Sequence, residues 1–396
     1  MRILALVSDL PNPPIGGSRV RNFHLWPAIR EYGHEVRVLG VNAFQEGWRD
    51  MDEAAANNDG EFFPRGRPLL PVRAFDAALR TYHERGRSPR LAERVDELVQ
   101  YWKPDVIHAE ELRMAYYLPR FRQVNSSALQ TVTFLNVESY LHHELSSLLS
   151  NPVRKLHGSI QEWSLRKYES RVVETADLLF AFSPIDYCRY RRAYPSGRWT
   201  QTRNGTDARH IPACPPANES KLLIVGALSY VPNTRGLLWL LDRVWPHLSR
   251  AFSLTVAGSG ASPELQERMA HAGVRFVDMP LNLEHLYRES SICVAPLLEG
   301  SGTRGKILEA CAYQRLVVTT TRGLEGLDLS PGKEGVIVAD DPVEFARALQ
   351  YWNDAAEERS KLAAQGREAV LKRYDWSVIA EDLTRQWTEC AARSRA

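Results

Sequence analysis

The chain has 396 residues, of which 44% are hydrophobic and 25% are charged, and its formal net charge is +2. This length exceeds what one hydrophobic core usually supports, so the composition indicates a soluble globular protein with two domains. The net charge argues neither for nor against a nucleic-acid partner, but no basic block resembles a DNA-binding arm, so no nucleic-acid partner is expected. No apolar run approaches the ~18 residues of a membrane span.

The five cysteines are scattered and form no C-x-x-C pair, which argues against a zinc or thiol-redox motif and suits a reducing cytoplasm. The first apolar run, RILALVSDL (2–10), is too short for a signal peptide and lacks a small-residue cleavage site. We therefore predict a first strand in this segment and a cytoplasmic location for the protein.

Strand and helix patterns alternate along the N-terminal half. Strands are predicted at 3–9, 34–41, 103–110, 129–136 and 177–183, and helices at 18–33, 88–101 and 153–176. The polar stretch 42–66 gives no clear pattern. Short apolar strands that alternate with helices are typical of a parallel sheet covered on both faces.

The stretch 204–220 is polar, rich in proline and not periodic, which indicates a linker. The alternation then restarts, with strands predicted at 221–228, 252–258, 274–279, 291–296, 315–320 and 335–340, and helices at 234–248 and 262–273. The fold class is therefore α/β, with two Rossmann-like halves. In such sheets ligands bind beyond the carboxyl ends of the strands.

Two turns after predicted strands are candidates for ligand binding. In PNPPIGGSRVR (11–21), Gly16 and Gly17 allow a ligand close to the backbone just before a helix, whose N-terminus attracts phosphate or sugar oxygens. The alternative is a plain tight turn. In GALSYVPNTRG (226–236), Arg235 could bind a diphosphate bidentately or could be a solvated side chain in the first turn of a helix.

The third turn, EGSGTRGKILEACA (299–312), contains three glycines and places Arg304 and Lys306 at a helix start. Cations are poorly placed at this end of a helix dipole unless an anion binds there. Lys306, Glu309 and Tyr313 share one helical face, so Glu309 could accept hydrogen bonds from ribose hydroxyls beside a bound diphosphate. A solvated Lys–Glu pair, worth a few tenths of a kcal/mol, is the alternative, but it leaves the glycines unexplained.

The C-terminal half resembles that of the group-1 (family-4) retaining glycosyltransferases in five ordered blocks: VGALSYVPNTRGLLWLL, LTVAGSG, VRFVDMPLNLEHLYRESSICVAPL, GSGTRGKILEACAYQRLVVTT and RGLEGL. The N-terminal half is similar more loosely, through IGGSRVR, DVIHAE, NVES and ADLLFAFS. RYDWSVIAEDLTRQW (373–387) resembles the helices that cross back onto the N-terminal domain in this family.

The resemblance implies the GT-B fold, with two Rossmann-like domains that face a cleft. It places an acceptor domain at 1–205, a linker at 206–219 and a nucleotide-sugar domain at 220–376. Residues 377–396 are then the crossing helix that returns to the first domain.

The resemblance also implies a hexosyltransferase-type enzyme that uses a nucleotide-diphosphate sugar, retains the anomeric configuration and needs neither a metal nor another cofactor. The expected donor contacts are Gly16, Gly17, Arg235, Met279, Leu281, Gly302, Thr303, Arg304, Lys306 and Glu309. Arg235 and Lys306 are expected to stabilise the charge that grows on the leaving phosphate. Glu138 and His142 are the catalytic candidates on the acceptor side.

Three positions depart from the family pattern. Glu309 matches the second glutamate of the usual E-x7-E motif, but Ser301 stands at the first. Ala227 occupies a position that is usually basic, and Leu135 occupies the place of a histidine that many relatives carry before an NVES-like stretch.

Two other hypotheses remain beside the glycosyltransferase. One is a nucleotide-sugar epimerase or hydrolase of the same shape, and the other is a non-catalytic nucleotide-sugar-binding protein. The acceptor is left open between a small molecule, a glycan and a lipid-linked molecule, and so is a peripheral contact with a membrane. The donor base and sugar do not follow from the sequence.

Overall fold

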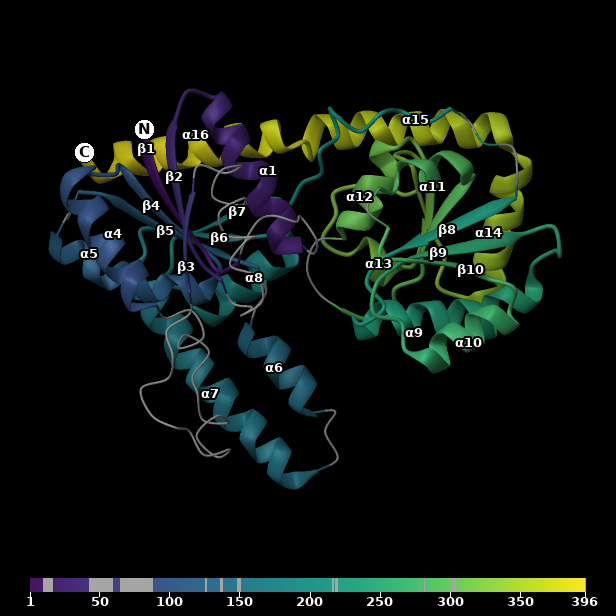
Figure 1. The fold of residues 1–396 in the computed structure, drawn as a ribbon, viewed down its shortest axis with the longest axis horizontal. Coiled ribbons are helices and arrows are strands. Elements are labelled where there is room, and N and C mark those ends of the chain that lie inside the picture. The colour runs from purple at the N-terminus through teal and green to yellow at the C-terminus, as the bar shows by residue number, and fades with distance from the viewer. Residues whose placement is uncertain are drawn as a thin grey trace. The chain divides into compact units, whose positions relative to one another are not determined.

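The computed structural model describes residues 1–9, 17–42, 60–64, 88–124, 127–135, 138–147, 151–215, 217, 220–280, 282–300 and 304–395. The chain divides into two compact units, Met1–Arg203 with Ile379–Ala396, and Asn204–Val378. Each unit contains one parallel sheet with helices around it (Figure 1), so the predicted α/β class is confirmed.

The sheet of the N-terminal unit has seven strands in the order β3-β2-β1-β4-β5-β6-β7. The strands are β1 (Arg2–Val7), β2 (Glu35–Asn42), β3 (Gly60–Pro64), β4 (Val106–Glu110), β5 (Leu129–Phe134), β6 (Leu178–Ala181) and β7 (Trp199–Gln201). All neighbours pair in parallel. The strand order reverses between β1 and β4, and ligands bind beyond such a switch point in open α/β sheets.

The described helices of this unit are α1 (Gly17–Glu31), α4 (Pro89–Tyr101), η2 (Leu112–Tyr117), α5 (Leu118–Val124), α6 (Glu138–Ser147), α7 (Pro152–Thr175), α8 (Pro184–Ala193) and most of α16 (Trp376–Arg395). Helix α4 shows why they form. Ser88 caps its N-terminus by accepting a hydrogen bond from the backbone of Leu91, and Pro89 occupies the first turn, where no backbone donor is needed. Leu91, Val95 and Leu98 then fall on one buried face.

Helix α16 begins in the C-terminal unit, and its residues from Ile379 onward belong to the N-terminal unit. Thr200 of β7 donates a hydrogen bond of 2.5 Å to Gln386. The ring of Trp387 is fully buried, with its centroid 5.3 Å from that of His108 on β4. These contacts make the end of the chain part of the N-terminal core.

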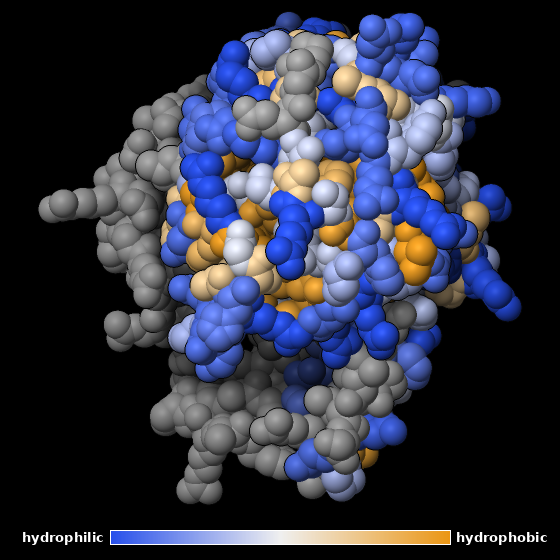
Figure 2. All heavy atoms as spheres, turned by 90° about the vertical axis from the view of Figure 1, so that its right-hand side faces the viewer, coloured by the Kyte–Doolittle hydropathy of each residue, from blue (hydrophilic) through white to orange (hydrophobic). Residues whose placement is uncertain are grey.

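The sheet of the C-terminal unit has six strands in the order β10-β9-β8-β11-β12-β13. The strands are β8 (Lys221–Val225), β9 (Ser253–Gly258), β10 (Arg275–Asp278), β11 (Ile292–Ala295), β12 (Leu316–Thr319) and β13 (Val336–Val338). The helices are α9 (Val231–Trp239), η3 (Leu240–Val244), η4 (Trp245–His247), α10 (Pro263–His271), α11 (Glu284–Glu289), α12 (Gly305–Ala312), α13 (Thr321–Leu324), α14 (Pro342–Asp354) and α15 (Ala356–Arg373). One outer face of this unit carries mainly hydrophilic side chains between smaller apolar areas (Figure 2).

Two predictions for this unit need correction. The helix predicted at 234–248 is regular only as far as Trp239 and continues as a π turn and a 3₁₀ turn, because Pro246 has no amide hydrogen for an α-helical bond. The predicted linker packs on the C-terminal unit. Thr206 donates to the carbonyl of Tyr374 at 2.9 Å, and Cys214 donates to that of Tyr313 at 3.1 Å.

None of the helices in the described part of the chain is long and apolar enough to cross a membrane.

Candidate functional site

Two glycines, Gly226 and Gly258, lie close together at the carboxyl ends of β8 and β9 in the C-terminal unit, and we call this pair the glycine cradle. Gly226 has a φ of +153°, and a Cβ at this position would lie 2.7 Å from Lys306 Nζ and 2.8 Å from Asn233 Nδ2. A Cβ at Gly258 would lie 2.0 Å from the carbonyl oxygen of Gly226. Only glycine therefore allows the backbone and the Lys306 ammonium to approach each other so closely.

Lys306 is a partly buried cation in the first turn of α12. Its Nζ donates a hydrogen bond of 2.6 Å to the side-chain oxygen of Asn233 in α9, which is a neutral partner. Burial lowers the pKa of Lys306 to about 8, and the charge of Arg304 adds to this effect. Among the described residues, no carboxylate forms an ion pair with Lys306.

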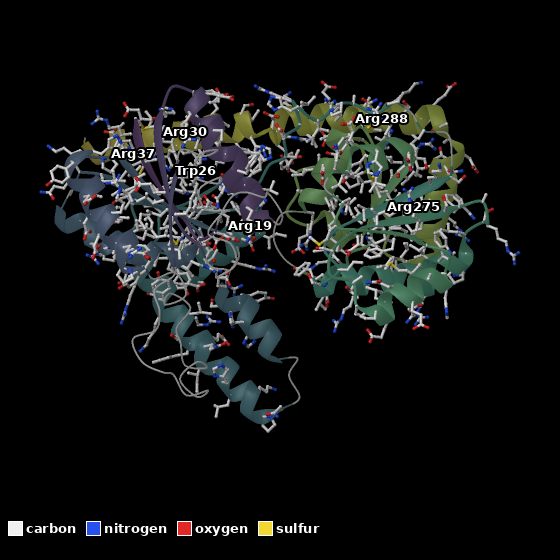
Figure 3. The ribbon with its side chains drawn as sticks, in the orientation of Figure 1. Arg19, Trp26, Arg30, Arg37, Arg275 and Arg288 are labelled. Atoms are coloured by element: carbon white, nitrogen blue, oxygen red, sulfur yellow. The ribbon has the colours of Figure 1, made fainter. Side chains whose placement is uncertain are left out.

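Other cations of this unit contrast with Lys306 because carboxylates neutralise them. Arg275 lies 3.1 Å from Glu289, and Arg288 lies 2.6 Å from Glu284, and both arginines are exposed (Figure 3). Burying a charge without a counter-charge costs free energy, so the site around Lys306 favours a bound anionic ligand.

Arg304 precedes α12 and is buried. Its Nη2 donates a hydrogen bond of 2.8 Å to the carbonyl of Gly300, which has a φ of +104°. This hydrogen bond joins the residue before the helix to the beginning of the glycine-rich turn. Gly302 and Thr303, two of the predicted donor contacts, lie outside the described residues.

Glu309 lies one turn beyond Lys306 on α12. Burial raises the pKa of Glu309 to about 7, and the facing hydroxyl of Tyr287 opposes this shift. The Tyr287 ring stacks on that of Tyr313, with centroids 4.3 Å apart. No ion pair links the described side chains of Lys306 and Glu309, so the solvated surface pair considered above is wrong.

Arg235 is exposed and forms an ion pair that the sequence did not indicate. Its Nη1 lies 2.8 Å from Glu299 Oε2, and the two side chains are 58% and 37% exposed. The neighbouring Gly236 lets α9 pack tightly, because a Cβ there would lie 2.1 Å from the carbonyl oxygen of Pro296. This packing carries Arg235 to the turn that begins at Glu299.

Met279 follows β10 at the same edge of the sheet and has a φ of +45°. Its amide donates a hydrogen bond of 3.0 Å to the carbonyl of Gly258, and its side chain is exposed. Tyr230 and Leu298 are also exposed apolar residues of this unit. Leu281, which was predicted to lie near the nucleotide base, is outside the described residues.

The predicted residues of the N-terminal unit that the structure describes lie on α1 and α6. Gly17 is the first residue of α1, and a Cβ there would meet nothing within 4 Å, so packing does not require glycine. Gly16 lies outside the described residues. Glu138 begins α6, and His142 lies partly buried one turn later on the same helix.

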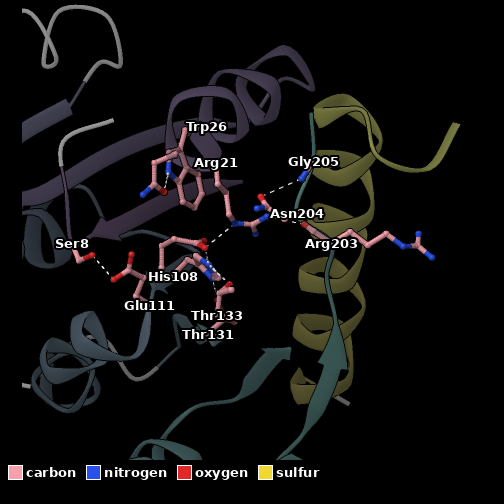
Figure 4. A network of polar contacts seen from close by, with 12 residues as sticks. Ser8, Arg21, Trp26, His108, Glu111, Thr131, Thr133, Arg203, Asn204 and Gly205 are labelled. Carbon is pink, nitrogen blue, oxygen red and sulfur yellow. Dashed lines mark hydrogen bonds and ion pairs between the residues drawn. The ribbon is translucent and has the colours of Figure 1, made fainter. Parts of the chain in front are cut away.

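A buried polar network at the switch point of the N-terminal sheet was missed by the sequence analysis (Figure 4). Arg21 of α1 donates to Glu110 of β4 at 2.7 Å and to the carbonyl of Arg203 at 2.8 Å. His108 Nε2 lies 3.0 Å from Glu110, and its Nδ1 lies 2.7 Å from the hydroxyl of Thr131. Burial alone would raise the pKa of Glu110, but Arg21 and His108 outweigh burial and lower it.

Glu111 carries a second polar contact at this switch point. Its φ of 83° is unusual for a residue with a side chain, and its buried carboxylate accepts a hydrogen bond from Ser8, which follows β1. Arg113 lies 3.2 Å from the same carboxylate. Burial raises the pKa of Glu111. The only signal in the sequence was the pair of glutamates at the end of a buried strand.

The described part of the chain contains no group of three or more His, Cys, Asp or Glu side chains that could hold a metal ion. Lys306 and the glycines beside it combine a cation with a closely approaching backbone, and both features suit a phosphate ligand.

Comparison with known proteins gives a family match for part of the chain. Residues 219–353 match the family described as "Glycosyl transferases group 1". An uncharacterized 44.6 kDa protein of the cps region of Klebsiella pneumoniae is 27% identical over 184 residues, or 42% of this chain, and the aligned part spans about half (47%) of that relative. A glycogen synthase of Mycobacterium tuberculosis is 24% identical over 96% of this chain and 92% of its own length.

Solved structures share the fold over nearly the whole chain. Sucrose-phosphate synthase of Thermosynechococcus elongatus has a TM-score of 0.75 and 18% identity, and the match covers 99% of this chain and 100% of that one. HepE of Anabaena in complex with UDP has a TM-score of 0.71 and 14% identity, and the match covers 98% of this chain and 100% of that one.

Proposed function

We propose that this chain, which is a group-1 glycosyltransferase with the GT-B fold, moves a sugar from a nucleoside-diphosphate donor to a hydroxylated acceptor. The observation that carries the proposal is Lys306, a partly buried cation that lies against the backbone of Gly226 and has no carboxylate partner in the described part of the chain. A diphosphate supplies the missing negative charge, and the UDP complex of HepE, a protein of the same fold, supports this ligand class.

Lys306 and Arg235 are proposed to hold the diphosphate together with the start of α12. As the bond between the sugar and the phosphate breaks, negative charge grows on the leaving phosphate. Fixed cations stabilise that charge more strongly in the transition state than in the ground state. Arg235 must then turn from Glu299 to the phosphate, which costs little because the ion pair is exposed.

Glu309 is proposed to accept hydrogen bonds from the ribose hydroxyls. Its position one turn beyond Lys306 suits a ribose attached to the bound diphosphate. The carboxylate must be ionised for this role, and its pKa of about 7 makes the ionised form accessible near neutral pH. Met279 is proposed to contact the base, because it is exposed at the neighbouring strand end.

Retention of the anomeric configuration is part of the proposal and rests on the resemblance to retaining enzymes. In that case the acceptor attacks on the face of the leaving group, and the departing phosphate oxygen takes the proton of the acceptor. Glu138 and His142 stay candidates for contacts with the acceptor. No metal is required in this scheme, because basic side chains carry the charge of the diphosphate.

The experiment is a screen of nucleotide sugars in which release of the free nucleoside diphosphate is followed with and without candidate acceptors. A glycosyltransferase releases nucleotide mainly when an acceptor is present, whereas a hydrolase does so without one and a binding protein does not turn over. NMR of the product reports the anomeric configuration.

The phosphate-binding role is tested with the donor and acceptor found in this screen. Arg235→Ala and Lys306→Ala should each lower kcat/KM by at least ~10²-fold, with part of the loss in kcat. Near-wild-type rates for both variants would rule out the phosphate role.

A further inference from the structure

Helices α6 and α7 form a hairpin that projects from the sheet of the N-terminal unit (Figure 1). Helix α7 has 24 residues and is therefore about 36 Å long at 1.5 Å per residue. Its C-terminal half is anchored in the core of the unit through Leu165, Val172 and Val173, which are buried. The N-terminal half extends away from this core.

The extended half of α7 carries an exposed apolar stripe. Leu156, Ile160 and Trp163 are 64%, 43% and 60% exposed. Their spacing of four and three residues places them on one face of the helix. The side of α7 that meets α6 is a different one, since His143 of α6 lies 2.9 Å from Glu162. Three large apolar side chains in a row on a solvated face mark an interaction surface.

The polar residues around this stripe are basic or neutral. The other exposed residues from 155 to 167 are Lys155, Ser159, Arg166 and Lys167. Lys167 Nζ lies 3.8 Å from the centre of the Trp163 ring. Glu162 is largely buried and paired with His143 and Arg166.

The nearest exposed acidic side chain further along the described part of α7 is Glu174, two turns beyond Lys167. The apolar stripe and its flanks therefore form a surface that is apolar at its centre and positively charged at its edge. We call it the α7 face and define it as residues 155–167.

We propose that the α7 face docks the protein on a bilayer surface that contains anionic lipids. Tryptophan and aliphatic side chains insert at the boundary between head groups and acyl chains, and lysines beside them bind the lipid phosphates. A second copy of the chain fits less well, because self-association through the stripe would bring the lysines at the edge of the two stripes close to one another. A nucleic acid would not require the aliphatic side chains.

This docking is peripheral and reversible, and it does not depend on the proposed sugar transfer. It would hold the N-terminal unit at the membrane, where an acceptor with a lipid tail would be presented. Binding to vesicles can therefore be measured without any nucleotide or acceptor, so its failure and the failure of the proposed transfer are separate results.

The test is flotation of the full-length protein with vesicles of phosphatidylcholine alone or mixed with phosphatidylglycerol. The wild type should float with the mixed vesicles at low salt and much less with phosphatidylcholine alone. The combined variant Leu156→Ser, Ile160→Ser, Trp163→Ser should lower the partition coefficient by about tenfold or more, because the apolar insertion is lost. The variant Lys155→Glu, Lys167→Glu should lose the preference for anionic vesicles.

The matched control is Tyr101→Ser, which removes an aromatic side chain that is 78% exposed at the end of α4. This variant should float like the wild type, and circular dichroism should show the same melting temperature for all variants. The proposal is overturned if the wild type does not float with anionic vesicles, or if the serine variant floats equally well. It is also overturned if light scattering shows a dimer that only the serine variant loses, because the stripe then binds a second copy.

Discussion

The affinity of the protein for a nucleoside diphosphate should have a bell-shaped pH profile, with its maximum between about pH 7 and 8. Lys306 has a lowered pKa of about 8, so its positive charge is present below this pH and is lost above it. Glu309 has a raised pKa of about 7, so its negative charge is present above this pH and is lost below it. Only between the two values are both groups largely in the form that binding requires.

The expected size of the effect follows from these two values. At pH 9 about one Lys306 side chain in eleven is charged, so the affinity should be about tenfold lower, or ~1.4 kcal/mol, than that of the protein with Lys306 fully charged. At pH 6 about one Glu309 side chain in eleven is ionised, which gives a similar fall. The terminal phosphate of the ligand also titrates near pH 6 and adds to the acidic limb.

Calorimetric titrations between pH 6 and 9.5 measure the affinity as a function of pH. Two variants then show which side chain causes the fall at acidic pH and which causes the fall at alkaline pH. Lys306→Arg stays charged throughout this range, so its alkaline limb should be flat. In Glu309→Gln the affinity should fall less at acidic pH, because only protonation of the terminal phosphate of the ligand still lowers it. A wild-type affinity that does not change from pH 7.5 to 9.5 would refute the assignment of Lys306 as the phosphate-binding cation.

Three further perturbations test other parts of the structure. Glu309→Ala should weaken binding of a ribonucleoside diphosphate by ~1–3 kcal/mol and binding of its 2′-deoxy analogue much less, as measured by calorimetry. Gly226→Ala should lower nucleotide affinity at least about tenfold, because the new Cβ would lie 2.7 Å from Lys306 Nζ and displace the ammonium. An unchanged affinity would show that the ammonium need not lie there. Arg21→Met should cost ~3–5 kcal/mol in urea unfolding, because Glu110 would remain buried without its cation, and adding Glu110→Gln should recover part of the loss.

Much of the fold was predictable because it depends on local patterns. Buried strands such as β1 and β11 are short apolar runs between helices, and the two sheets follow from their alternation. The ordered blocks of the C-terminal half predicted a group-1 glycosyltransferase, and residues 219–353 match the model of that family. Strand β3 (Gly60–Pro64) was missed because it lies in a polar stretch, and its pairing with β2 is a tertiary contact.

The geometry of the candidate site was predictable where neighbours in sequence are neighbours in space. Lys306 and Glu309 share α12, so their common face could be deduced from their spacing. The ion pair of Arg235 with Glu299 joins residues 64 positions apart, and only the packing of α9 brings them together. Burial shifts the pKa of Glu309, and burial depends on tertiary packing; even the opposing contact comes from Tyr287, which belongs to another helix and could not be placed from the sequence.

The most direct test of the account is calorimetry of the intact protein with UDP, GDP, ADP and TDP at pH 7.5. The account predicts that at least one of these ligands binds, and that Lys306→Ala weakens its binding by about tenfold or more while the protein stays folded. Arg268→Ala, which removes an exposed arginine paired with Asp242 on the surface of the same unit, serves as the control and should bind like the wild type. Absence of binding for all four nucleotides, or equal binding by the wild type and Lys306→Ala, would contradict the account.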